Sequence, residues 1–513
     1  MRTLLFFATV GCAALLVAIS GLKVQVPAAG KAAWPAAVAQ PVAPGSFATD
    51  ANVPTRKLNF PPVGTVALYG NMATPAEVVL FISGDGGWNL GVVDMAKALA
   101  QDGQTLVVGI DIVKYYKKLQ STDEKCLYPA GDMENLSEFV QKELKLPVYH
   151  KPVLAGYSSG ATLSYGLLCQ APAGTFKGGV ALGFCPDIQV RKPLCEGSGK
   201  LTMVRRKDGL GFDFTDQPAP AAPLEVLQGE VDQDCHCQKT LDFFENVPNV
   251  TVTRLPKVGH GFAVTKNWLP QFRASFARVA PAVKSDGTFR HQTSANSLSV
   301  LATLSDAVGA TGAGLPVAIT PAPADSNTPL VLFISGDGGW TGFDQQICDQ
   351  LSAKHLPVVG LNSQSYFWKA KSPEQTTNDL APLLRQYLAQ WGKSKFLLLG
   401  YSFGANVAPF VYNRLPADLR EKAEGVVLLS PDVKGDFEIH VAGMLGWGGG
   451  AYDVAAEVRR MEGVPVLCVS GEKEDNAFKQ ALQGAAHTRF VKIPGSHHYD
   501  NDAVKVARTI WSK

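Results

Sequence analysis

Two serines stand in the same short motif, and that motif is typical of a catalytic nucleophile. Residues 156–160 (GYSSG) and 400–404 (GYSFG) both read G-x-S-x-G, each after an apolar segment and before a helical pattern. In this strand-turn-helix context the serine oxygen stands above a sheet, and the helix N-terminus stabilises developing negative charge. The flanking glycines are needed because side chains there would clash in so tight a turn. Ser158 and Ser402 are therefore candidate nucleophiles.

A serine of this kind needs a histidine base and an acid that orients the histidine, in the chain order serine, acid, histidine. After Ser158, one strand-like segment ends at Gly229 and is followed by Asp232. The next strand-like segment leads into His260. These positions predict a first set made of Ser158, Asp232 and His260.

In the second copy, two neighbouring residues compete for the role of the acid. Asp475 lies 73 residues after Ser402, close to the 74 residues from Ser158 to Asp232. Glu474 instead lies three residues after a glycine, as Asp232 does. We prefer Asp475 as the acid and keep Glu474 as the alternative.

The base of the second copy is also one of two neighbours. Counted from Pro494, His498 occupies the place that His260 has after Pro256. The local Gly-His-Gly-Phe pattern around His260 favours His497 instead. We prefer His498 as the base and keep His497 as the alternative.

A second duplicated signature, SGDGGW, follows an apolar segment at residues 83–88 and again at 335–340. In hydrolases with this serine motif, such a loop supplies one amide of the oxyanion hole, and the residue after the nucleophile supplies the other. A P-loop is excluded because no Gly-Lys-Ser/Thr follows. The predicted oxyanion and substrate-binding residues are Gly84, Asp85 and Ser159 in the first copy and Gly336, Asp337, Gly338 and Phe403 in the second.

The repeated motifs indicate two whole domains, since 252 residues separate Gly84 from Gly336. In each copy, short apolar strand-like runs alternate with helical patterns, which predicts a mostly parallel sheet with helices on both faces. The fold class is therefore α/β, with two tandem α/β-hydrolase domains. The predicted boundaries are an N-terminal domain over 63–280 and a C-terminal domain over 313–513, with linkers over 40–62 and 281–312; residues 316–319 are the expected first edge strand of the second domain.

The N-terminus is typical of an exported protein. Arg2 precedes an apolar stretch over residues 4–22, and residues 37–39 (AVA) would suit cleavage of a signal peptide. A retained membrane anchor in residues 4–22 is the alternative, because this stretch is close to the length of a membrane span. Either reading predicts that most of the chain lies in the periplasm.

Composition and cysteine usage narrow the function classes. The formal net charge is only +2 and no long basic block is present, so we expect no nucleic-acid partner. An exported chain can keep disulfides among the six cysteines of the first copy, whereas Cys348 and Cys468 fit buried thiols. The Cys235-His236-Cys237 segment has no paired ligand set, so a disulfide or loop packing is expected there rather than a metal. We expect no cofactor.

The second copy resembles the AcvB/VirJ virulence-protein family almost throughout. The resemblance rests on the SGDGGW loop, on residues 357–368 with their Tyr-Phe-Trp ending, on residues 372–376 (SPEQT), on the GYSFGA motif and on residues 497–500 (HHYD). The first copy is similar more loosely, as in the longer AcvB form. Asn406 and Tyr499 depart from the usual family residues, but neither belongs to the predicted catalytic set.

The resemblance implies a periplasmic serine hydrolase of aminoacyl-phosphatidylglycerol, chiefly lysyl-phosphatidylglycerol, at the membrane surface. Ser402 would attack the aminoacyl ester, with consequences for lipid homeostasis, virulence and type IV secretion. A cationic lysyl group would favour nearby acids, although surface positions and helix caps explain such residues as well. These acids are Asp337, Asp344, Glu374 and Asp379.

Two rival functions stay open at this point. One is a general periplasmic esterase or lipase, which should also cleave neutral acyl esters. The other is a non-catalytic periplasmic scaffold or chaperone of a secretion machine. The sequence also leaves open whether the first copy is active.

Overall fold

The computed structural model describes residues 55–121, 124–215, 217–280, 314–325, 327–440, 450–485 and 487–511. The predicted signal or anchor segment 4–22 and the linker 281–312 lie outside these ranges. Within them, no helix is both long and apolar enough to cross a membrane.

The N-terminal half (residues 55–280) contains an eight-stranded sheet in the order β1-β2-β4-β3-β5-β6-β10-β11. The β1·β2 and β2·β4 pairs are antiparallel, and the other neighbours are parallel. The strands are β1 Thr55–Phe60, β2 Gly64–Gly70, β3 Glu77–Ile82, β4 Thr105–Ile110, β5 Val153–Tyr157, β6 Gly178–Leu182, β10 Leu224–Gly229 and β11 Val250–Leu255. The helices are α1 Leu90–Ala100, α2 Ile112–Leu119, α3 Pro129–Glu143, α4 Ser159–Gln170, α5 Cys237–Phe244, η1 Thr265–Asn267 and α6 Leu269–Val279.

The C-terminal half (residues 314–511) repeats this arrangement with a seven-stranded sheet in the order β12-β14-β13-β15-β16-β19-β20. Only β12 is antiparallel to its neighbour. The strands are β12 Val317–Thr320, β13 Leu330–Ile334, β14 Val358–Leu361, β15 Phe396–Tyr401, β16 Ala423–Leu429, β19 Val466–Gly471 and β20 Thr488–Ile493. The helices are α7 Gly342–Ser352, α8 Ser363–Tyr366, α9 Pro373–Gln390, α10 Phe403–Arg414, α11 Ala417–Arg420, α13 Val454–Arg459, α14 Ala477–Ala481, η2 Tyr499–Asn501 and α15 Ala503–Ile510.

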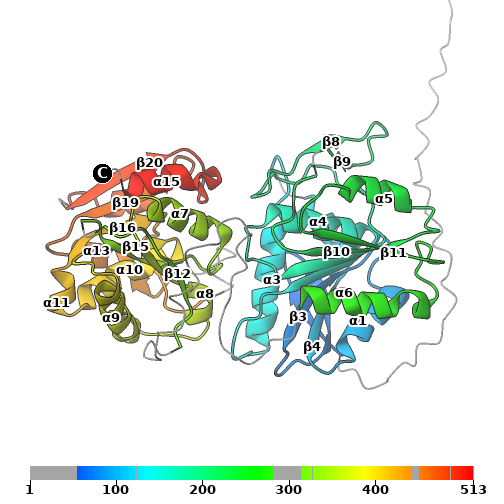
Figure 1. Cartoon of the computed structure of the whole chain (residues 1–513), viewed down its shortest axis with the longest axis horizontal. Helices are drawn as coiled ribbons and strands as arrows, with labels where there is room; N and C mark the ends of the chain where they lie inside the picture. Colours follow the sequence, from blue (N-terminus) through cyan, green and yellow to red (C-terminus); the bar gives the residue numbers. More distant parts are fainter. Residues whose placement is uncertain are drawn as a thin grey trace, which may run out of the picture. The chain divides into compact units, whose positions relative to one another are not determined.

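Each sheet is buried between two helical layers (Figure 1). Strand β3 shows why, because its residues from Val78 to Ile82 are apolar on both faces and all are buried. Val78, Leu80 and Ile82 join the core formed with α3 and α4, whereas Val79 and Phe81 join the core formed with α1 and α6. Alternate residues of a strand point to opposite faces, so a continuous apolar run requires cover on both sides. This confirms the predicted α/β-hydrolase fold.

The strand order fixes where the site must lie. After β3 the chain moves to β4 on one side, and after β5 it moves to β6 on the other side. Connections that diverge in this way leave a crevice beyond the carboxyl ends of the two strands, where ligands of α/β sheets bind. Strands β13 and β15 form the same switch point in the C-terminal half. The SGDGGW loops follow β3 and β13, and the G-x-S-x-G motifs follow β5 and β15.

Several features of the fold were not predicted, among them strand β2. Strand β1 lies inside the segment 40–62 that we expected to be a linker, because its polar residues sit on an exposed edge strand. The N-terminal half also carries a small antiparallel sheet of β7 Asp187–Ile188, β9 Phe212–Phe214 and β8 Met203–Arg205, while β17 Lys434–Gly435 pairs with β18 Tyr452–Asp453 in the C-terminal half. The expected edge strand near 316–319 is β12.

Candidate functional site

Both motif serines occupy a strained turn between a strand and a helix. Ser158 has φ 55° and ψ −122°, and Ser402 has φ 52° and ψ −115°. A side-chain-bearing residue in this region costs about 1–3 kcal/mol, and such strain persists only where the surrounding structure enforces it. Here the serine amides donate to Leu182 and Leu429 carbonyl oxygens at 2.8 Å in both copies. The serine side chain is thereby held beyond the strand end, at the N-terminus of α4 or α10.

The motif glycines allow this turn because no side chain would fit at their positions. A Cβ on Gly400 would lie 2.3 Å from the Gly404 carbonyl oxygen. A Cβ on Gly404 would lie 2.0 Å from the Ile334 carbonyl oxygen at the end of β13. Gly156 and its partner glycine in the N-terminal half show the same contacts at 2.1 and 2.2 Å. Helix and sheet can therefore approach only through glycine.

We expect Gly404→Ala to destabilise the protein by about 3 kcal/mol, because the new methyl group would force α10 away from β13. Thermal unfolding of the purified protein measures the effect. Gly91→Ala is the control, since a Cβ on Gly91 of α1 would meet no atom within 4 Å. Equal melting temperatures for the two variants would contradict the packing argument.

In the N-terminal half, the three predicted residues form one hydrogen-bonded chain. His260 Nε2 lies 2.9 Å from Ser158 Oγ, and His260 Nδ1 lies 2.9 Å from Asp232 Oδ2. Asp232 is buried, and its Oδ1 accepts the amides of Asp234 and Cys235 at 3.0 and 2.8 Å. The structure thus brings together the whole predicted set.

In the C-terminal half, the corresponding chain uses the two residues that we ranked second. His497 Nε2 lies 2.9 Å from Ser402 Oγ, and His497 Nδ1 lies 2.8 Å from Glu474 Oε1. The Glu474 Oε2 atom accepts the Gly471 amide at 2.5 Å and the Ser430 hydroxyl at 2.8 Å. Our preference for His498 and Asp475 is therefore wrong.

The rejected residues have other partners. His498 Nδ1 lies 2.8 Å from the Tyr401 hydroxyl. Asp475 is exposed, and its Oδ1 accepts the Ala477 amide at 2.9 Å at the start of α14. Burial and the neighbouring His497 lower the pKa of His498.

The histidine and the acid adjust each other's ionisation. Burial by itself would lower the pKa of His497, but the hydrogen bond and charge of Glu474 outweigh it and raise that pKa above its ordinary value of 6.5. Burial would raise the pKa of Glu474, but hydrogen bonds from His497, Gly471 and Ser430 hold it below the ordinary value. The pKa of His260 is raised in the same way, by Asp232 against the effect of burial.

These shifts predict the acid limb of the pH profile. A base must be neutral to accept the serine proton, so kcat/KM of the Ser402 site should rise with pH through a midpoint above 6.5. Glu474→Gln removes the largest of the influences that raise the pKa of His497, while burial and the charges of Asp337 and Asp432 remain, so the midpoint should move to lower pH and the plateau should fall. Ester hydrolysis by the Ser158→Ala protein between pH 5 and 9 measures this. An unmoved midpoint would mean that another group titrates.

The SGDGGW loops pack directly against the serines. A Cβ on Gly84 would lie 3.0 Å from Ser158 Cβ, and one on Gly336 would lie 3.6 Å from Ser402 Cβ. Ser159 and Phe403 are the first residues of α4 and α10, and the first amides of a helix have no partner within it. The predicted oxyanion residues, including Asp85, Asp337 and Gly338, therefore lie on the loop and helix end that flank each serine.

Sequence reasoning missed the residues that hold the histidine and the acid. The Tyr157 hydroxyl donates to the His260 carbonyl oxygen at 2.8 Å, and Tyr401 reaches the His497 carbonyl oxygen at 3.2 Å. The tyrosine before each serine was the available signal, because both motif copies contain it. Ser430 has no counterpart in either motif, so only the structure reveals its contact with Glu474.

The acid loop of the N-terminal half is tied down covalently. Disulfides join Cys185 to Cys235 and Cys126 to Cys195 in this half. Cys235 is thus not available as a metal ligand, which agrees with the expected disulfide in this segment. Cys348 and Cys468 are buried free thiols, as expected. Asp232, Asp234 and His260 place ligand atoms within 4.8 Å of one another, but the serine chain already accounts for Asp232 and His260.

Reduction should weaken the N-terminal site selectively, since the Cys235 amide donates to Asp232 while its sulfur is bonded to Cys185. Loss of the bridge loosens the acid that orients His260. We expect a several-fold fall in p-nitrophenyl butyrate hydrolysis by the Ser402→Ala protein after reduction. The Ser158→Ala protein is the control, and an equal fall in both would point to general unfolding.

Comparisons with known proteins find several hydrolases among the similar solved structures. An α/β serine hydrolase without a lid from Xanthomonas campestris is 20% identical with a TM-score of 0.28, over 45% of this chain and 97% of that one. The esterase domain of a Rhodothermus marinus protein is 17% identical with a TM-score of 0.30, over 44% and 98%. An α/β serine hydrolase homologue from Coxiella burnetii is 14% identical with a TM-score of 0.29, over 44% and 96%. A search of curated protein sequences gives no match.

The profile of the bacterial virulence protein (VirJ) family matches residues 76–171 and 328–513. The first range runs from β3 into the start of the segment after α4, and the second contains the whole Ser402 site. Together the two ranges make up more than half of the residues. The chain therefore belongs to the bacterial virulence protein (VirJ) family.

Proposed function

We propose that this chain is a periplasmic serine hydrolase that removes the aminoacyl group from aminoacyl-phosphatidylglycerol, with lysyl-phosphatidylglycerol as its main substrate. The observation that carries the proposal is the Ser402-His497-Glu474 chain, which lies at the switch point of the sheet within the range matched by the family. The resemblance to the AcvB/VirJ proteins supports the substrate, and the exported type of N-terminus supports the location.

The geometry suits ester cleavage through an acyl-enzyme. Ser402 Oγ attacks the aminoacyl carbonyl carbon while His497 Nε2 takes the serine proton, and Glu474 stabilises the imidazolium. Amides of Phe403 and the Asp337 loop receive the oxyanion. The ester C–O bond then breaks, and His497 returns the proton to the glycerol oxygen of phosphatidylglycerol. Water repeats these steps, releasing the amino acid and the free serine.

We propose the Ser158 site as a second hydrolase centre in the same chain. Its serine, histidine and acid are joined at distances of 2.9 and 2.9 Å, against 2.9 and 2.8 Å in the Ser402 site. A fluorophosphonate probe should therefore label both Ser158 and Ser402, which peptide mass spectrometry can count. A label on Ser402 alone would reduce the first copy to an accessory role.

The test of the substrate compares two kinds of ester. The full chain, purified in detergent, is given lysyl-phosphatidylglycerol in mixed micelles, and released lysine is quantified. Unmodified phosphatidylglycerol, with fatty acyl esters only, is the matched control. Release of lysine without fatty acid supports the proposal. Release of fatty acid instead would identify a general esterase or lipase, and no release would refute hydrolysis of this lipid.

A further inference from the structure

At one backbone position beside the catalytic residues, the two halves carry side chains of different charge. Gly183 and Ser430 are equivalent, because their amides donate to the carbonyl oxygens of Leu227 in β10 and Val469 in β19. Two residues further on stand Cys185 in the N-terminal half and Asp432 in the C-terminal half.

Side-chain contacts confirm that equivalence. Thr162 of α4 donates to the Cys185 carbonyl oxygen at 2.7 Å. Asn406, at the same place in α10, accepts the Asp432 amide at 2.8 Å and reaches the Asp432 carboxylate at 3.4 Å. The same backbone position is thus neutral and covalently closed in one half, and carries a carboxylate in the other.

A cavity of about 670 Å³ surrounds this position in the C-terminal half. Its lining includes Asp432 together with Glu474 and His497 of the site. Apolar walls come from Val469, Phe478, Phe490 and Val491. The cavity thus combines the catalytic histidine, apolar walls that can contact methylene groups, and a carboxylate. These features match an alkyl chain that ends in an ammonium group.

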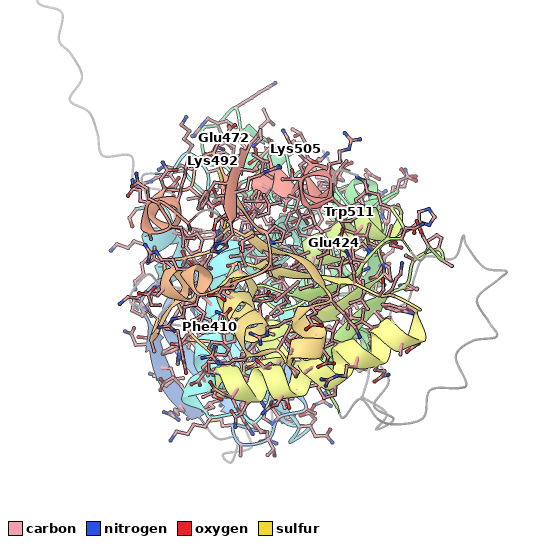
Figure 2. The ribbon with its side chains drawn as sticks, turned by 90° about the vertical axis from the view of Figure 1, so that its left-hand side faces the viewer. Phe410, Glu424, Glu472, Lys492, Lys505 and Trp511 are labelled. Atoms are coloured by element: carbon pink, nitrogen blue, oxygen red, sulfur yellow. A yellow bond between two sulfur atoms is a disulfide. The ribbon has the colours of Figure 1, made fainter. Side chains whose placement is uncertain are left out.

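Asp432 is available for such a ligand. It is exposed and forms no ion pair with a lysine or arginine in the described ranges, and residues 441–449 contain neither residue type. The cavity also holds Lys479 and Lys492, but Lys492, labelled in Figure 2, donates to the Glu474 carbonyl oxygen at 2.8 Å. Desolvation raises the pKa of Asp432, and the charges of Glu474 and Asp337 add to this effect, although Asn406 and His497 act in the opposite direction.

Of the four acids named from the sequence, Asp337 lies on the oxyanion loop of the site, and the other three are already engaged. Glu374 forms an ion pair with Arg414 at 2.8 Å, and Asp379 accepts the Tyr366 hydroxyl at 2.5 Å. Asp344 is buried in the capping box of α7. The interpretation of these three as surface or capping residues holds, whereas Asp432 was not recognised from the sequence.

In the N-terminal half, the backbone position equivalent to Asp432 is the neutral Cys185, and the carboxylate beside His260 comes from Asp234, on a different loop. The cavity of this half, of about 500 Å³, is bordered by the Cys185–Cys235 bridge. The nearest acid along the chain, Asp187, forms an ion pair with Arg206 at 2.5 Å. Arg206 also contacts Asp208 and Asp213.

We infer that Asp432 is a specificity residue that binds an ammonium group of the acyl part of the substrate, so that the Ser402 site prefers cationic acyl esters. This inference rests on the proposed function of Ser402 as a nucleophile, but not on the lipid nature of the substrate.

Three soluble esters test it in the full-length Ser158→Ala protein. The ethyl esters of lysine and norleucine differ by the side-chain ammonium, and those of norleucine and hexanoic acid differ by the α-ammonium. Asp432→Asn keeps the size of the side chain and its contact with Asn406. For one of these pairs, we expect Asp432→Asn to lower the kcat/KM of the ester with the extra ammonium, relative to its partner, roughly 10-fold. The reason is the loss of a charge-assisted contact. Asp432→Glu should restore part of the ratio.

Asp475→Asn is the matched control, because it removes the same charge from the same cavity. Unchanged ratios in both pairs for Asp432→Asn, or an equal fall for Asp475→Asn, would overturn the inference. If the wild type discriminates these esters but leaves lysyl-phosphatidylglycerol intact, the lipid proposal fails and the role of Asp432 stands.

Discussion

Ser402→Ala should abolish the release of lysine from lysyl-phosphatidylglycerol, with a loss of ~10⁴-fold or more in kcat. The Ser402 oxygen forms the ester bond of the proposed acyl-enzyme. Alanine lacks this oxygen but leaves the strand-to-helix turn, the cavity and the oxyanion loop in place. Ser158→Ala should keep most of the activity, because the C-terminal half has its own complete chain of hydrogen bonds. Time courses of lysine release by wild type and both variants measure this.

The Ser158→Ala/Ser402→Ala double variant separates the remaining interpretations of these results. It should be as inactive as Ser402→Ala on this lipid. A loss in Ser158→Ala alone would assign the lipid to the N-terminal half, and full activity of the double variant would refute serine catalysis altogether. Thermal unfolding serves as the folding control, and the variants should unfold near the temperature of the wild type because alanine keeps the same Cβ in the same backbone conformation.

The second large effect separates two adjacent histidines. His497→Gln should lower kcat by ~10⁴-fold, because Ser402 loses its base. His498→Gln should lower kcat by less than about 10-fold, because His498 contacts Tyr401 and can affect catalysis only through the position of His497. Hydrolysis of lysine ethyl ester by the Ser158→Ala protein carrying each change gives both values.

Glutamine serves at both positions because it preserves one polar end group and similar bulk. A large loss for His498→Gln with little effect of His497→Gln would contradict the geometry. Similar large losses of kcat for both variants would mean that His498 also contacts the reacting atoms. The 2.8 Å contact of His498 with Tyr401 does not place it there.

The fold was predictable because its signals are local. Continuous apolar runs such as Val78 to Ile82 must be buried on both faces, and they alternate with helices in both copies. Strand β1 escaped prediction because an exposed edge strand buries little and its sequence, TRKLNF, reads as polar. The sheet order could not be read from the sequence, since it depends on which side each connection takes.

The site was predictable to within one residue, and the error has a physical cause. The acid follows a strand-ending glycine by three residues in both copies, because that glycine and the turn after it pack against the histidine loop. Distances counted across several loops, such as Ser402 to Asp475, absorb insertions and deletions. The histidine loop itself is one residue shorter in the C-terminal half, so the count from Pro494 pointed to His498 instead of His497.

A better anchor was present two residues after the histidine. Phe262 and Tyr499 are both buried at positive φ, of 49° and 52°. Their rings pack against Tyr157 and Tyr401 with centroids 5.9 and 6.3 Å apart. An aromatic residue two places after the histidine therefore fixes the loop in both copies, whereas Ser430 and Asp432 depend on tertiary contacts that no local pattern records.

The duplicated strand-to-helix turn at Ser158 and Ser402 affects how the turnover number of this protein must be measured. Two serines held at φ 55° and 52° give one chain two places at which an acyl group can accumulate. Active-site titration should then show a burst of up to two equivalents per chain, in two phases wherever the halves acylate at different rates. Turnover numbers expressed per chain would average two catalysts, so each must be measured with the other serine removed.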